Sequence, residues 1–167
     1  MTNENAIRRV QPWKEIDHPN IVSVVEAFTT QEFNGESSLV FVTDYFPLSK
    51  TLTEQHSAPA HRYGKSGSAA IAEDVLWSYI VQLAAAIKQI HGAGLAVRCM
   101  DPGKIILTDK NRVRLAACSI LDVVHFDRQR SLADLQLEDM REFGKLILGL
   151  GVGNPSANVQ ATAAIVE

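Results

Sequence analysis

The densest group of chemically capable side chains lies in the segment VRCMDPGKIIL, residues 97 to 107. It combines a guanidinium, a thiol, a carboxylate and an ammonium group, carried by Arg98, Cys99, Asp101 and Lys104. A thiol beside a cation can be a reactive nucleophile, because the positive charge lowers the pKa of the thiol. The apolar neighbours Val97 and Met100 favour instead a small buried side chain at Cys99. The segment therefore predicts a packed loop rather than a nucleophilic centre.

Two other features, a possible phosphate-binding loop and the histidines, have the residue types of a functional site but not the spacing that such a site requires. Gly64-Lys65-Ser66 resembles the end of a phosphate-binding P-loop, but that loop requires a glycine five residues before Gly64, where the chain has Pro59. The five histidines are scattered, and none lies beside a carboxylate and a nucleophile in a recognisable arrangement. We expect capping or packing roles for His18 and His91, and a solvated linker around Gly64.

Composition limits the function classes. A chain of 167 residues, 46% hydrophobic and 21% charged, is long and apolar enough for a folded globular chain. Its net charge of -3 disfavours RNA binding by this segment, because phosphate backbones attract clustered basic surfaces. Cys99 and Cys118 have no close cysteine partner, which argues against a zinc site or disulfide framework. No segment has the pattern of a signal peptide or membrane span, so we expect a cytoplasmic protein.

The elements that must position the segment can be read from the periodicity of apolar residues. From Ala72 onward, seven apolar residues recur at spacings of three and four, which predicts one helical face. They are Val75, Leu76, Tyr79, Ile80, Leu83, Ile87 and Ile90. Glu73 and Asp74 suit the first turn, and His91 and Gly92 indicate the end. The pattern predicts a helix that leads directly into the loop.

Shorter elements flank this helix. Residues 21 to 28 and 39 to 46 have the β-branched and aromatic composition of strands and are separated by a turn-forming stretch, so they predict an antiparallel hairpin. KIILT and RVRLAA, on either side of DKN, predict a second hairpin after the loop. Residues 6 to 17 predict a short or broken helix, because Pro12 interrupts the backbone ladder. A further helix is predicted over 138 to 150.

The order of these elements resembles that of a protein kinase from the end of helix C to helix F. HPNIV (18 to 22), LVFVTDYF (39 to 46) and the span from Trp77 to Leu115 carry the resemblance. The stretches LWSYIVQLAAAIKQIHGAGLAVRCMDPGKIILT and DYFPLSKTLTEQH are closer still, and resemble the pseudokinase domain of the regulatory subunit of the poly(A)-specific nuclease deadenylation complex.

The resemblance implies a truncated α+β, protein-kinase-like fold. Its parts are a small-lobe remnant (1 to 43, the end of helix C and two strands), a hinge (44 to 51), a flexible insertion (52 to 71) and a partial large lobe (72 to 167). A glycine-rich loop and a strand lysine would precede this chain, and Arg9 lies near the helix C position that pairs with that lysine. A dimerising coiled coil and a globular C-terminal region would follow it.

The catalytic loop and the D-F-G segment both depart from those of an active kinase. The catalytic loop runs H-R-D-L-x-x-x-N, where the Asp accepts a proton and the Asn holds magnesium. Here Val97 and Cys99 replace the His and Asp, Lys104 replaces the Asn, and the D-F-G segment falls on Ala117-Cys118-Ser119. A positioned base is worth ~10² to 10⁴ in rate, and Lys104 would repel the metal. The alignment therefore predicts no catalytic residue and no metal.

Other positions match structural or binding roles of the resembling family. Arg98 matches the loop arginine, and Asp139 matches the buried Asp that opens helix F and hydrogen-bonds the loop backbone. That family binds ATP, and its nucleotide-contacting stretches match Asp44, Tyr45, Phe46, Pro47, Leu48, Ser49, Lys50, Thr51, Gly103 and Lys104. In this interpretation Lys104 is a phosphate counter-charge that substitutes for a metal, with ATP bound but not hydrolysed. The alternative is that 44 to 51 is only an interlobe connector and Lys104 a solvated lysine.

The resemblance also implies a function: a cytoplasmic scaffold, with a place in P-bodies, that dimerises through regions missing from this chain. Its implied partners are the catalytic nuclease subunit and poly(A)-binding protein, and through them it would direct shortening of messenger RNA tails. Two alternatives stay open. One is a fragment of an unconventional kinase that uses Asp101 as a relocated base, and the other is a nonfunctional truncated product.

Overall fold

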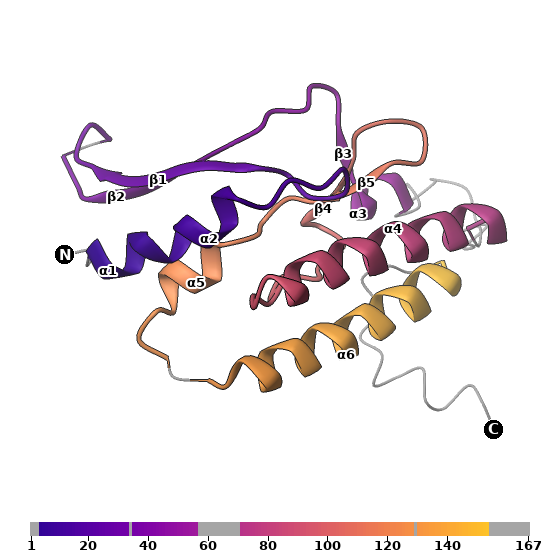
Figure 1. Cartoon of the computed structure of the whole chain (residues 1–167). Coiled ribbons are helices and arrows are strands. Elements are labelled where there is room, and N and C mark those ends of the chain that lie inside the picture. The colour runs from indigo at the N-terminus through magenta and orange to yellow at the C-terminus, as the bar shows by residue number, and fades with distance from the viewer. Residues whose placement is uncertain (1–3, 34, 57–70, 129, 154–167) are drawn as a thin grey trace.

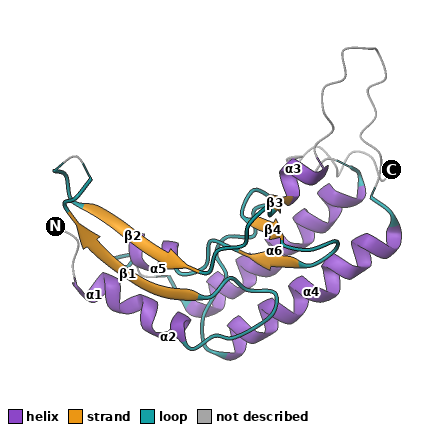
Figure 2. Cartoon of the chain, turned by 90° about the horizontal axis from the view of Figure 1, so that it is seen from above, coloured by secondary structure: helices purple, strands orange, loops and turns teal. Residues whose placement is uncertain are grey.

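The computed structural model describes residues 4–33, 35–56, 71–128 and 130–153. Two long helices lie side by side, a small sheet covers one side of them, and a two-stranded ribbon extends away over short N-terminal helices (Figures 1 and 2). The candidate P-loop, Gly64 to Ser66, falls outside the described residues.

The N-terminal segment is helical in three short pieces, α1 (Glu4–Ile7), the 3-10 helix η1 (Arg8–Val10) and α2 (Gln11–Lys14). Pro12 lies in the first turn of α2, where the missing amide hydrogen leaves no hydrogen bond unmade. The prediction of a short or broken helix is confirmed. Val10 and Trp13 are each only 1% exposed, so this segment is part of the core.

The first predicted hairpin is present as β1 (Val24–Thr30) and β2 (Ser38–Thr43), antiparallel with Phe28 opposite Val40. The predicted ranges began three residues too early in the first strand and ended three residues too late in the second. Ile21 instead forms an isolated parallel bridge with Leu115. Asn20 donates hydrogen bonds to Gln82 Oε1 (2.8 Å) and to the carbonyl of Val113 (2.9 Å).

The second hairpin joins a small three-stranded sheet in the order β3 (Lys50–Thr51), β4 (Ile105–Leu107) and β5 (Val113–Leu115). β4 and β5 are the predicted pair around DKN, with Ile105 opposite Leu115. β3 adds Lys50 and Thr51 opposite Leu107 and Ile106. The last two residues of the expected hinge are thereby tied to the strand that follows the loop.

The expected flexible insertion is wrong at its start. Residues 52 to 56 form α3 (Leu52–His56), and Leu52 is fully buried. Glu54 Oε2 accepts hydrogen bonds from the Thr51 amide (2.7 Å) and hydroxyl (3.0 Å), while the Glu54 amide donates to Thr51 Oγ1. This reciprocal capping box fixes the start of the helix. Residues 57 to 70 lie outside the described residues.

The long helices α4 (Glu73–Gly92) and α6 (Leu132–Gly151) flank the loop, and α5 (Ile120–Val124) lies between the small sheet and α6 in the chain. The predicted face of α4 packs into the core, with Tyr79, Leu83, Ile87 and Ile90 buried. α6 begins six residues before the predicted start of 138, because Ser131 caps it by accepting a hydrogen bond from the Asp134 amide at 3.1 Å. Among the described residues no helix is long and apolar enough to cross a membrane.

Candidate functional site

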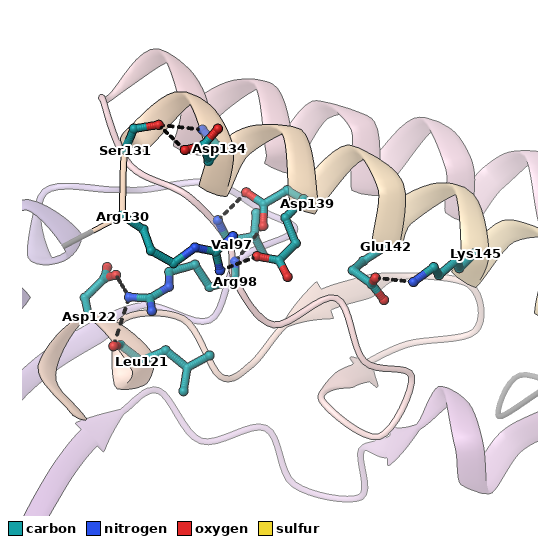
Figure 3. A network of polar contacts seen from close by, with 11 residues as sticks. Val97, Arg98, Leu121, Asp122, Arg130, Ser131, Asp134, Asp139, Glu142 and Lys145 are labelled. Atoms are coloured by element: carbon teal, nitrogen blue, oxygen red, sulfur yellow. Dashed lines mark hydrogen bonds and ion pairs between the residues drawn. The ribbon is translucent and has the colours of Figure 1, made fainter. Parts of the chain in front are cut away.

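The segment 97 to 104 is an irregular loop, and one buried carboxylate accepts hydrogen bonds from its first two backbone amides. Asp139, on α6, is 2% exposed. Its Oδ2 accepts a hydrogen bond from the Val97 amide and its Oδ1 from the Arg98 amide, both at 2.7 Å (Figure 3). Oδ2 also lies 2.8 Å from His91 Nε2, at the end of α4. A buried carboxylate is stable only when its oxygens accept hydrogen bonds. The donors to Asp139 among the described residues come from the loop and from the end of α4.

A second residue of α6 supports the turn that precedes the loop. Gln136 donates from Nε2 to the carbonyl of Leu95 at 2.9 Å. Gly94 in this turn has a φ of 73°, a conformation that glycine adopts without strain. Gln136 and Asp139 lie three residues apart, so both point from one face of the helix. The resemblance predicted Asp139, but nothing in the sequence pattern singled out Gln136.

Arg98 is fixed at both its backbone and its side chain. Its φ of 58° is left-handed, which costs a non-glycine residue on the order of 1 kcal/mol and is sustained here by the Asp139 hydrogen bond. Its Nη1 donates to the carbonyl of Leu121 at 2.9 Å and to Asp122 Oδ1 at 2.8 Å. The second oxygen of Asp122 accepts from the indole Nε1 of Trp13 at 2.7 Å. The loop is thus connected to α5 and, through it, to α2.

Cys99, which occupies the base position, is half-buried and is not an ionised nucleophile at neutral pH. Burial raises the pKa of its thiol, and the neighbouring Asp101 carboxylate raises the same pKa, while Lys104 opposes them. Cys118 lies in the segment aligned with D-F-G, where burial foremost raises the pKa of its thiol to about 12. Neither sulfur offers a thiolate, so both cysteines behave as small apolar side chains.

Asp101 is exposed, and its side chain hydrogen-bonds the backbone of the turn that it begins. Its Oδ1 accepts from the Gly103 amide at 2.6 Å, and its carbonyl accepts from the Lys104 amide at 2.8 Å. A Cβ on Gly103 would lie 2.9 Å from the same carboxylate oxygen, so the turn has room only for glycine unless Asp101 moves. The carboxylate stabilises the turn, and this occupation argues against its use as a relocated base.

The segment aligned with D-F-G carries no acidic side chain. Ala117 is half-buried, and Cys118 and Ser119 are buried. Ser119 has a φ of 72°, and its hydroxyl has no hydrogen-bond partner among the described residues. The Ser119 carbonyl accepts from the amides of Asp122 and Val123, which starts α5. The described part of the chain also contains no group of three or more histidine, cysteine, aspartate or glutamate side chains that could hold a metal.

The predicted nucleotide stretch 44 to 51 ends beside the loop. β3 pairs with β4, and the Thr53 amide donates to the carbonyl of Pro102 at 3.2 Å. Within the stretch, the guanidinium of Arg114 lies over the Phe46 ring, 4.3 Å from its centroid. Tyr45 is 85% exposed and Leu48 is 98% exposed, so these two side chains have little contact with the described residues. The end of the stretch therefore pairs with the strand that follows the loop, with Lys50 and Thr51 opposite Leu107 and Ile106 rather than opposite Gly103 and Lys104.

Lys104 is exposed, and its ammonium group forms no ion pair with a described residue. Its backbone is fixed, since its amide donates to Asp101 and its carbonyl accepts from Ala116 at 3.0 Å. A free cation on a fixed backbone can serve as a counter-charge for a phosphate group.

Sequence reasoning missed Trp13, Asp122 and Gln136. They lie far apart in the chain, and each meets its partner only after the helices have packed. The local patterns around them carried no signal beyond an apolar or polar residue type. His18 has a local role, since its Nδ1 accepts from the Asn20 amide at 3.1 Å. The capping or packing role expected of His91 did not anticipate its contact with Asp139, which lies 48 residues later in the chain.

Comparison with known proteins identifies close relatives. No model of a protein family matches the chain. The PAN2-PAN3 deadenylation complex subunit PAN3 of Coccidioides immitis is 58% identical over 158 residues, which is 93% of this chain and 24% of that protein. The corresponding PAN3 subunit of Aspergillus terreus is 52% identical over 165 residues, 99% of this chain and 25% of that protein. The chain spans about a quarter of the length of the curated relatives it matches.

A solved structure agrees with the sequence matches. The complex of Neurospora crassa PAN2 (WD40-CS1) with PAN3 (pseudokinase and C-term) contains a chain that matches with a TM-score of 0.85 and 47% identity. The match covers 99% of this chain and 41% of that one. The expectation of a partial kinase-like α+β fold is confirmed.

Proposed function

We propose that this chain, which belongs by its sequence and fold to the PAN3 pseudokinase family, is a noncatalytic scaffold segment of a deadenylation complex subunit. One observation carries the proposal. Asp139 holds the loop backbone at 2.7 Å from two amides, while the positions that would supply the base and the metal ligands hold Cys99, Lys104 and Ala117. The loop's architecture is retained, and its chemical groups are replaced.

Phosphoryl transfer depends on positioning and on neutralising charge with bound metal ions. Loss of a base and of two metal ligands together removes several kcal/mol of transition-state stabilisation, at ~1.4 kcal/mol for each tenfold in rate. We propose that the segment has no kinase activity and acts by presenting a folded surface. The partners proposed for the protein that contains it are the catalytic nuclease subunit PAN2, poly(A)-binding protein and a second copy of itself, in the cytoplasm.

The scaffold proposal is tested by co-purification of the full-length protein with PAN2 and, separately, with poly(A)-binding protein. Asp139→Asn removes the charge that supports the loop and should weaken PAN2 capture if the pseudokinase architecture matters. Lys104→Gln changes a position where the metal-binding Asn of active kinases is already absent, and it should leave PAN2 capture unchanged. A well-folded wild-type protein that captures neither partner would contradict the proposal.

We also propose that the protein binds ATP without hydrolysing it, with Lys104 facing the phosphates. Two observations support this proposal. The Lys104 ammonium group forms no ion pair with a described residue, and β3, at the end of the 44 to 51 stretch, pairs with β4, the strand that follows the loop. Isothermal titration with ATP in the absence of magnesium tests this. Lys104→Gln should weaken ATP binding about tenfold, whereas Lys110→Gln, an exposed lysine in the β4–β5 turn, should not. Equal affinities for the two variants would contradict the role of Lys104.

A further inference from the structure

A cavity of about 390 Å³ lies where η1, the turn before the loop and the connection from α5 to α6 meet. Its lining is rich in positive charge, supplied by Arg9, Arg98, Arg128 and Arg130. Asp122 is the carboxylate among its described lining residues. The chain as a whole has a net charge of -3, so the cations gather here against the average charge of the protein.

Each oxygen of the carboxylate in this cavity already accepts a hydrogen bond from within the protein. One oxygen of Asp122 accepts from Arg98 at 2.8 Å and the other from Trp13 at 2.7 Å. The same Nη1 of Arg98 also donates to the carbonyl of Leu121, which holds this guanidinium against α5. The Arg98–Asp122 pair therefore cancels its own charge and leaves the other cations of the cavity without a compensating group from its lining.

Three arginines remain to attract an anion. Arg9 and Arg128 are exposed and form no ion pair with any described residue. Arg130 pairs with Glu138 at 2.7 Å, but both side chains are nearly half exposed, so water screens that pair and a stronger anion can compete for it. Arginine is well suited to this purpose, because its planar guanidinium can bind two oxygens of a phosphate group at once.

The start of α6 adds to the positive potential. Leu132 and Leu135, from the first turn of this 20-residue helix, line the cavity, so the positive end of the helix dipole lies beside it. Asp134 in the same turn offsets part of this field, although its side chain is bonded to Ser131 and does not line the cavity. Leu95 and the partly exposed Phe126 complete an apolar section of the wall.

We infer that this cavity binds a phosphate monoester carried on a peptide, a phosphoserine or phosphothreonine with an apolar neighbour. The arginines would hold the phosphate dianion, and the apolar wall formed by Leu95, Phe126, Leu132 and Leu135 would contact the adjacent side chain. The volume lies within the range of ordinary ligand pockets, ~300 to 1,000 Å³, and exceeds the needs of a bare anion. This site shares Arg98 with the loop and is separate from the stretch proposed for ATP.

The test measures binding of two probes to the full chain by isothermal titration at low salt. One probe is the peptide Ala-Leu-phosphoserine-Leu-Ala with blocked ends, alongside its unphosphorylated form, and the other is inorganic phosphate. We expect the phosphopeptide to bind and the unphosphorylated peptide not to bind. The double variant Arg9→Gln/Arg128→Gln should weaken binding at least about tenfold, because each lost charge-assisted hydrogen bond accounts for about that factor.

The matched control is Arg8→Gln/Arg141→Gln. It removes the same charge from two exposed arginines that do not line the cavity, one beside Arg9 and one on α6. Circular dichroism confirms that each variant is folded. If the phosphopeptide binds more tightly than inorganic phosphate, the anion is carried by a peptide. If the two bind equally, the site binds a free anion, and the assignment to a peptide is overturned. No binding of either probe, or equal losses in both double variants, overturns the site.

Discussion

The indole Nε1 of Trp13 donates a hydrogen bond to the carboxylate of Asp122, 2.7 Å away and 109 residues later in the chain. Because the other oxygen of Asp122 bonds Arg98, the N-terminal helices are fixed to the loop by two consecutive charge-assisted contacts. Trp13 is 1% exposed, so the indole contributes apolar packing as well. The orientation of the short N-terminal helices and that of the loop are therefore parts of one network.

A double-mutant cycle on this pair measures the link. Trp13→Phe keeps an aromatic ring and removes the donor, so it should cost ~1 to 3 kcal/mol in free energy of unfolding. In the background of Asp122→Ala the same change should cost ~1 to 2 kcal/mol less, because the acceptor is gone. Urea denaturation checks both values, and a coupling energy near zero would mean that the hydrogen bond contributes nothing to stability.

Asp139→Asn tests the support of the loop. The asparagine side chain keeps only one acceptor oxygen, and its NH2 group would face either the Arg98 amide or the Val97 amide with His91, so we expect a loss of ~3 kcal/mol in free energy of unfolding. The control is Glu142→Gln on the same helix, whose ion pair with Lys145 is exposed, and which should change stability by less than ~1 kcal/mol. Equal effects of the two substitutions would show that the buried carboxylate is not a principal support.

Alkaline pH should destabilise the fold through Cys118. Its pKa is raised by burial to about 12 in the folded chain, from an ordinary value of 9.0. Between these values the unfolded chain releases a proton that the folded chain keeps, so stability falls as pH rises above 9, by at most ~1.4 kcal/mol per pH unit from this group. Cys118→Ala should flatten the fall in urea midpoint between pH 9 and 11. An unchanged slope would show that this thiol does not titrate differently on unfolding.

Acidic pH should act through His56. Burial lowers the pKa of this imidazole below its ordinary value of 6.5, and its Nε2 lies 3.2 Å from the hydroxyl of Tyr79. The unfolded chain then binds a proton more readily than the folded chain, so the contribution is present above pH 6.5 and is lost as pH falls below it. His56→Gln should reduce the loss of thermal stability between pH 7 and 5. His18, whose pKa is also lowered by burial, is kept in both samples as a constant background.

Sequence patterns predicted the elements that depend on local periodicity. The face of α4 and the β4–β5 hairpin were accurate, because buried faces and tight turns leave direct marks in the chain. The start of α6 was missed, although Leu132 and Leu135 have helical spacing and Ser131 is a typical N-cap residue. α3 was missed because its five residues are too short for periodicity, and its burial depends on Leu52 contacting other elements.

Some residues of the candidate site were likewise predictable from the sequence, and others were not. Arg98 in the loop and Asp139 on α6 were predictable from the resemblance, and the structure adds the hydrogen bonds that Asp139 makes. Trp13, Asp122 and Gln136 were not, because each bonds a partner at least 41 residues away in sequence. The arginine-lined cavity was equally hidden. Arg9 and Arg128 line one cavity only because the N-terminal helices pack beside α5.

The central claim is that the loop keeps its architecture while its phosphotransfer chemistry is absent. The most direct measurement is transfer of labelled phosphate from ATP with magnesium by the full-length protein, in wild type and in Asp101→Ala. We predict no transfer above the protein-free blank for either protein. Transfer by the wild type that disappears in Asp101→Ala would contradict the account and identify an active, relocated base.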